Sequence, residues 1–130
     1  MDVSKLMNPQ AFMSIFGEIP TFVNSELLDV QLKREGPTLF IRLMTNQLVK
    51  KKPARWMDKW DVIYIEMSFF ATRNLAISGW SSTNLIDQFE IKETDDEGFL
   101  NIRCSNQTQI QCAFDWARVE QVSPGLIGTP

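Results

Sequence analysis

The chain contains no histidine, so the side chain that most often serves as general base, nucleophile partner or metal ligand is missing. Acid–base chemistry would therefore have to use carboxylates alone. The candidates lie in one stretch of the sequence and are Asp87, Glu90, Asp95, Asp96 and Glu97. A solvated strand edge and turn account for this stretch better than a catalytic pair does. We therefore expect no enzyme and no catalytic residues.

Motifs for nucleotides and metals are also missing. The sequence has no glycine-rich phosphate loop, no Walker-type Gly-Lys-Ser/Thr and no Gly-x-Ser-x-Gly elbow. Cys104 and Cys112 lack the further ligands that a structural zinc site needs. They flank a polar turn at 106–108, and a hairpin centred there would place them nearly opposite each other. We expect reduced thiols, as in the cytosol, with no metal and no cofactor.

The densest charge is acidic. Four carboxylates, Glu93, Asp95, Asp96 and Glu97, fall within five residues that read as a hairpin tip. On a protruding hairpin they could steer a cationic partner and pair with its lysine or arginine. The alternative is a soluble turn that discourages edge pairing. These four residues, together with Trp80, are the partner-binding residues that the sequence predicts.

Tryptophan is both a core anchor and a favoured interface residue, and the chain has four, Trp56, Trp60, Trp80 and Trp116. We expect core positions in general. Trp80 follows Gly79 and precedes the polar residues 81–83, so its context is the one that suggests a surface ring. The run Lys50 to Lys52 reads as a solvated loop without a function.

Composition limits the remaining classes. A length of 130 residues suits one domain, here 1–130, and 44% hydrophobic with 22% charged residues is typical of globular proteins. A net charge of −3 and a pI near 4.9 disfavour nucleic acid as a partner. No signal peptide and no long apolar run are present, so we expect a cytoplasmic protein without a membrane span.

Hydrophobic periodicity predicts one helix followed by strands. The helix should cover about 8–17, with Asn8 as N-cap and Gly17 as its end. Alternating apolar and polar residues predict strands between about 27 and 122. Their approximate ranges are 27–34, 38–45, 61–71, 74–80, 88–93, 98–105, 110–116 and 118–122. A flexible tail should follow at 123–130. The expected fold is α+β, mostly antiparallel β, with seven or eight strands in a twisted sheet or flattened barrel and one N-terminal helix.

Several short segments, in order, resemble the landmarks of one family. These are Asn8-Pro9 before a helix, Phe16-Gly17-Glu18-Ile19-Pro20, Arg34-Glu35-Gly36-Pro37-Thr38-Leu39, Pro53-Ala54-Arg55-Trp56 and Leu75-Ala76-Ile77-Ser78-Gly79-Trp80-Ser81. The chain resembles the immunity proteins of bacterial polymorphic toxin systems, specifically immunity protein 50, over most of residues 8 to 122. Arg55 stands where the family pattern has lysine.

The resemblance implies an antitoxin that binds and neutralises a cognate secreted or contact-delivered toxin domain during bacterial competition. Binding would occlude the toxin active site. The alternative is a small-ligand or carbohydrate-binding β module, which a cavity lined by tryptophan would favour. A homodimer through an exposed edge strand stays open.

Overall fold

The computed structural model describes residues 2–127, which form one short helix and eight strands. Helix α1 is Gln10–Phe16. The strands are β1 Glu26–Lys33, β2 Thr38–Thr45, β3 Val62–Phe70, β4 Arg73–Ser78, β5 Ile86–Glu93, β6 Gly98–Cys104, β7 Gln109–Phe114 and β8 Trp116–Gly125.

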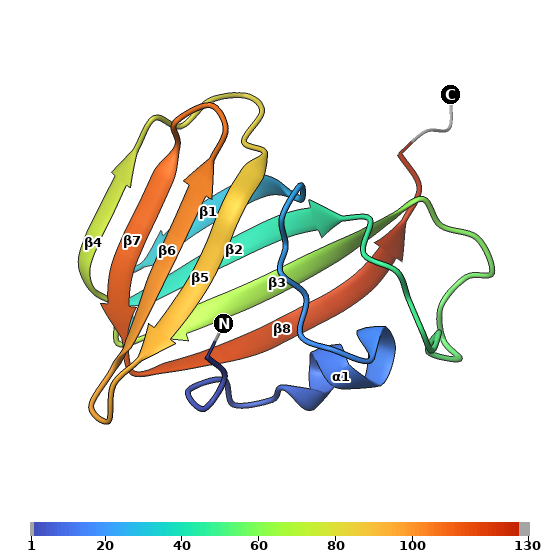
Figure 1. The fold of residues 1–130 in the computed structure, drawn as a ribbon, viewed down its shortest axis with the longest axis horizontal. Coiled ribbons are helices and arrows are strands. Elements are labelled where there is room, and N and C mark those ends of the chain that lie inside the picture. Colours follow the sequence, from blue (N-terminus) through green and yellow to red (C-terminus); the bar gives the residue numbers. More distant parts are fainter. Residues whose placement is uncertain (1, 128–130) are drawn as a thin grey trace.

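The strands form two four-stranded antiparallel sheets. Sheet A has the order β1-β2-β3-β8 and sheet B the order β4-β7-β6-β5. Figure 1 shows the strands of the two sheets running in clearly different directions, with α1 beside β8. The predicted α+β class with mostly antiparallel strands is confirmed. Its strands divide between two sheets and do not close into a barrel in the part of the chain that the structure describes.

The chain passes between the sheets at two neighbouring corners. Ala71 and Thr72 connect β3 to β4, which pairs with β7 and not with β3. Asp115 connects β7 to β8, and its N–H donates to the Phe70 carbonyl at 2.9 Å. Because the chain changes sheet at Asp115, the inward-facing positions move from even-numbered residues in β7 to odd-numbered residues at the start of β8, and Trp116 points outward with 50% of its surface exposed. The core position expected for Trp116 is wrong for this reason.

The first hairpin agrees with the sequence. β1 and β2 pair antiparallel around a turn with a cis Gly36–Pro37 peptide bond, and Lys33 lies opposite Thr38. Alternate residues of β2 face inward and are fully buried, namely Leu39, Ile41 and Leu43. This alternation is what one covered sheet face requires.

Helix α1 closes part of the space between the sheets. Its apolar residues Phe12, Ile15 and Phe16 join the core, and Gly17 ends it with a φ of +75°. The expected cap is wrong, because Pro9 occupies the N-cap and Asn8 makes no cap hydrogen bond. The Asn8 side chain instead donates to the Val119 carbonyl and accepts from the Val119 N–H, both at 2.9 Å.

The N-terminal segment ties the two sheets together at their edges. The Asp2 N–H donates to the Ile91 carbonyl of β5 at 2.9 Å, and the Met7 N–H donates to the Ala117 carbonyl of β8 at 2.8 Å. At the other end, β8 continues to Gly125, paired with Val62. The expected tail thus begins inside a strand at 123–125, and residues 128–130 lie outside the described residues.

Candidate functional site

The hairpin between β5 and β6 carries the predicted carboxylates, and we call residues 93–97 the acidic tip. Glu93 turns away from solvent toward the N-terminal segment. Its carboxylate accepts from the Ser4 N–H at 3.0 Å, from the Lys5 N–H at 2.5 Å and from the Ser4 hydroxyl. Glu93 therefore fastens the chain terminus to sheet B, and most of its hydrogen-bonding capacity is used inside the molecule.

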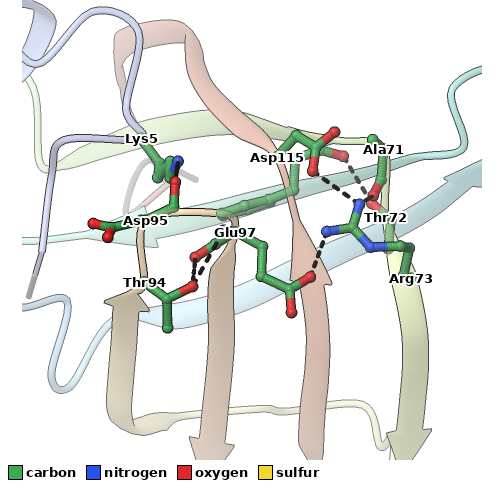
Figure 2. A network of polar contacts seen from close by, with 9 residues as sticks. Lys5, Ala71, Thr72, Arg73, Thr94, Asp95, Glu97 and Asp115 are labelled. Carbon is green, nitrogen blue, oxygen red and sulfur yellow. Dashed lines mark hydrogen bonds and ion pairs between the residues drawn. The ribbon is translucent and has the colours of Figure 1, made fainter.

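Glu97 is also engaged. Figure 2 shows the Arg73 guanidinium between two carboxylates, at 2.5 Å from Glu97 and 3.0 Å from Asp115, with a further hydrogen bond of 2.6 Å to the Ala71 carbonyl. The hydrogen bond to Glu97 raises the pKa of Arg73, against the opposing effect of partial desolvation and with the help of Asp115. The corner that joins the two sheets is thus braced against the base of the tip.

Asp95 and Asp96 provide the free negative charge of the tip. Both are exposed, and within residues 2–127 neither carboxylate has a hydrogen-bond or ion-pair partner. The Lys5 ammonium donates to the Asp95 backbone carbonyl at 3.2 Å and so holds the turn (Figure 2). The tip consequently presents two free carboxylates on a fixed backbone.

Trp80 lies at the opposite end of sheet B, on a loop that a buried polar network holds in place. Asn84 is 2% exposed, and its side-chain oxygen accepts from the Thr108 hydroxyl at 2.8 Å and from the Ser81 N–H at 3.1 Å. The Thr108 hydroxyl is also 2.7 Å from the Gly79 carbonyl. The indole of Trp80 is 46% exposed. An exposed aromatic residue on an ordered loop loses little entropy when a partner covers it.

The edge strand β4 connects these two ends, since it begins at Arg73 beside Glu97 and ends two residues before Trp80. Seven residue steps from Arg73 to Trp80 span about 23 Å in extended chain. A standard interface covers about 800 Å² per partner, a patch roughly 30 Å across. One partner lying along β4 would therefore reach both the tip and Trp80.

The two remaining carboxylates that the sequence analysis considered for acid–base chemistry, Asp87 and Glu90, do not form a pair, and Asp87 is exposed on β5. Glu90 accepts from the Gln88 amide at 2.6 Å and pairs with Lys92 at 3.6 Å. No group of three or more potential metal ligands occurs in the described residues. No helix there is long and apolar enough to cross a membrane.

The cysteines are not opposite each other. Both are free and buried, but the hairpin register places Cys112 opposite Leu100, and the Cys104 N–H donates to the Thr108 carbonyl at 2.8 Å. The hairpin register is centred on Asn106, two residues earlier along the chain than the centre at Thr108 that a Cys104–Cys112 pairing requires. Burial raises the pKa of Cys112 to about 11 and also raises that of Cys104.

A surface that the sequence analysis set aside is the segment 50–59, which we call the basic segment. It borders a cleft of about 930 Å³ between α1 and the edge of β8. The run of lysines from Lys50 to Lys52 was the sequence feature that could have indicated this basic surface. The surface gains a candidate binding role only from the neighbouring edge strand β8, which the sequence pattern does not reveal.

A match to a family model covers residues 8–125 of this chain, and the family is described as immunity protein 50. The chain therefore belongs to the immunity protein 50 family. A search of curated proteins and a search of solved structures found no match. The resemblance that the sequence motifs indicated is confirmed.

Proposed function

We propose that this protein is a cytoplasmic immunity protein that binds a cognate toxin domain and neutralises it by covering its active site. The observation that carries the proposal is the family match over residues 8–125. Such a protein needs a shaped surface and no catalytic group of its own. The chain lacks histidine, which agrees with a role in binding.

The contact surface in this proposal is the β4 edge with the acidic tip and Trp80. Asp95 and Asp96 supply negative charge that the protein does not neutralise. A cationic toxin surface could therefore form ion pairs with them without first breaking an ion pair inside this protein. Trp80 supplies an exposed aromatic ring, the residue type most enriched among interface hot spots.

The alternative of a carbohydrate-binding module has less support. The cleft does include Trp56 in its wall, but Trp56 is only 6% exposed. A buried indole cannot offer its face for stacking against a flat ligand. A protein partner therefore remains the better match to the surface.

The test is co-expression with the toxin domain encoded beside this protein, scored by growth rescue and by affinity. Wild type should rescue growth and bind with a Kd at or below about the nanomolar range, roughly 12 kcal/mol. Asp95→Lys with Asp96→Lys should weaken binding by at least about tenfold, and Trp80→Ala by a similar factor.

The matched control is Glu18→Lys with Asp58→Lys, which makes the same change in net charge at two exposed positions beside α1 and in the basic segment, and should leave affinity within about twofold. Absence of binding and rescue by the wild-type protein would overturn the function. Binding that survives all three β4-edge substitutions would overturn the assigned surface.

A further inference from the structure

The basic segment carries the largest unneutralised charge of the described chain. Its ten residues hold five cations, Lys50, Lys51, Lys52, Arg55 and Lys59, and one carboxylate, Asp58, a net charge of +4. Because the whole chain has a net charge of −3, the other residues together carry −7. Within residues 2–127, only Lys52 among these cations is paired, at 2.9 Å from the Trp56 carbonyl and 3.8 Å from Asp58.

The cleft lies directly beside these charges. Its volume is about 930 Å³, and its walls come from α1, from the basic segment and from residues 119–124 of β8. Lys51 and Arg55 line it from the basic segment, and Ala11 and Met57 add accessible apolar surface to the same lining. Glu120 is the carboxylate of the lining, and Arg118 already pairs with it.

The walls of the cleft are fixed by internal contacts. The N–H groups of Lys50 and Lys51 both donate to the Ile15 carbonyl, at 2.9 and 3.1 Å, which fastens the basic segment to the end of α1. The Trp56 ring is buried and meets Trp60 edge-on at 5.5 Å between ring centroids. A binding site whose walls are already ordered pays less entropy when it is occupied.

The third wall is an unpaired strand edge. Residues 5–8 cover the outer edge of β8 at Ala117 and Val119. From 120 to 124, β8 makes no backbone hydrogen bond outside its pairing with β3 to any residue in 2–127. Pro124 and the register shift near Glu66 limit this edge to a short stretch, about 13 Å of extended chain. Such an edge can accept a short extended peptide as an added strand.

We propose that this cleft binds a short, extended, acidic segment of a protein partner. The free edge of β8 would pair with the peptide backbone, Lys51 and Arg55 would pair with its carboxylates, and the apolar surface would receive alternate side chains. This inference goes beyond the proposed function, because it concerns a different surface of opposite charge and does not depend on the partner being a toxin.

A peptide suits the site better than a nucleic acid. The lining offers two free cations, Lys51 and Arg55, together with apolar surface. Tight nucleic-acid binding typically neutralises about six to ten phosphates. The charge of −7 on the rest of the molecule would repel a long polyanion that extends past the cleft.

The test measures binding of a fluorescent peptide that alternates glutamate and valine, about five residues long to match the free edge. Fluorescence anisotropy at low salt should give a Kd in about the micromolar range, weakening as salt screens the charge pairs. Lys51→Glu with Arg55→Glu should raise the Kd by at least about tenfold. Lys51→Gln with Arg55→Gln is the second variant, and circular dichroism checks that each is folded.

The matched control is Lys33→Glu with Arg34→Glu, the same pair of residue types at the β1–β2 turn, which should leave the Kd within about twofold. The proposal is overturned if wild type does not bind the peptide at about millimolar concentration. It is equally overturned if the control variant loses as much affinity as the cleft variant, or if a thymidine oligonucleotide binds more tightly than the peptide. None of these results bears on toxin binding through β4, which is measured separately.

Discussion

The acidic tip and the basic segment have opposite charge, and they differ in how much of that charge the protein neutralises itself. Glu93 binds the N-terminal segment and Glu97 binds Arg73, so half of the four predicted carboxylates have structural partners. In the basic segment one of five cations is paired. Charge density along the sequence is therefore a poor guide to the charge that a partner meets.

The two regions also differ in how they are attached. The tip is held by polar contacts at its base, which involve exposed or half-exposed side chains. The basic segment is held by a buried indole and by backbone hydrogen bonds to α1. Substitutions should consequently cost far more stability under the basic segment than at the tip, since exposed ion pairs contribute at most about 1 kcal/mol.

The largest effect is expected for Trp56→Ala. Removing the buried indole leaves a cavity beneath the basic segment, and loss of a buried tryptophan costs about 3 kcal/mol or more. Denaturant titration followed by far-UV circular dichroism measures the change. The same variant should also weaken peptide binding at the cleft, because its wall loses support.

Trp116→Ala is the matched control, because it removes the same side chain from an exposed position. Trp116 is 50% exposed, and the Lys5 ammonium lies over its ring, 5.3 Å from the ring centroid. The expected loss is below about 1 kcal/mol. Equal losses for the two variants would mean that Trp56 does not anchor the basic segment as described.

Asn8→Ala should have a smaller effect at the boundary of the cleft. It removes both hydrogen bonds to the Val119 backbone and costs about 1 to 2 kcal/mol. Asn8→Asp separates this role from helix capping, since aspartate caps a helix as well as asparagine does but cannot donate to the Val119 carbonyl. Full stability of Asn8→Asp would show that the hydrogen bond to the carbonyl contributes nothing.

The sequence was sufficient to predict the individual helix and strands. It was insufficient to predict how the strands divide between two sheets. Alternation identified the strands, as in β2, and Gly17 identified the end of α1. The division into two sheets depends on Ala71 and Asp115, where the chain changes sheet. No local periodicity marks such a corner, and the strand pattern simply continues through Asp115 to Trp116.

The candidate site was predictable to a similar degree. The tip carboxylates were found from composition and turn signals, but their partners Ser4 and Arg73 lie 89 and 24 residues away along the chain. The same limit applied to Cys104 and Cys112. Whether they lie opposite each other in the hairpin depends on which residue is at the centre of the turn, and the sequence did not determine that residue. Contacts between residues so far apart along the chain depend on the tertiary structure, and the pattern of residues within a short segment does not predict them.

The smallest effect concerns Cys112, which reports on the base of the tip. Burial raises its pKa to about 11 from 9.0, and the nearby Arg73 guanidinium partly offsets this. Since the unfolded thiol ionises first, the contribution to stability is complete below pH 9 and is lost as pH rises toward about 11. Alkylation of Cys112 in a Cys104→Ser background should therefore accelerate only as pH approaches the folded pKa.

Arg73→Met tests whether that guanidinium acts on Cys112 while it is paired with two carboxylates. Removing its positive charge should move the alkylation profile to higher pH, whereas Arg103→Met, on the outer face of β6, should not move it. A profile unchanged by Arg73→Met would mean that Glu97 and Asp115 already neutralise Arg73 completely. Arg73 would then exert no net electrostatic effect at the base of the acidic tip. The free negative charge of the tip would come from Asp95 and Asp96 alone.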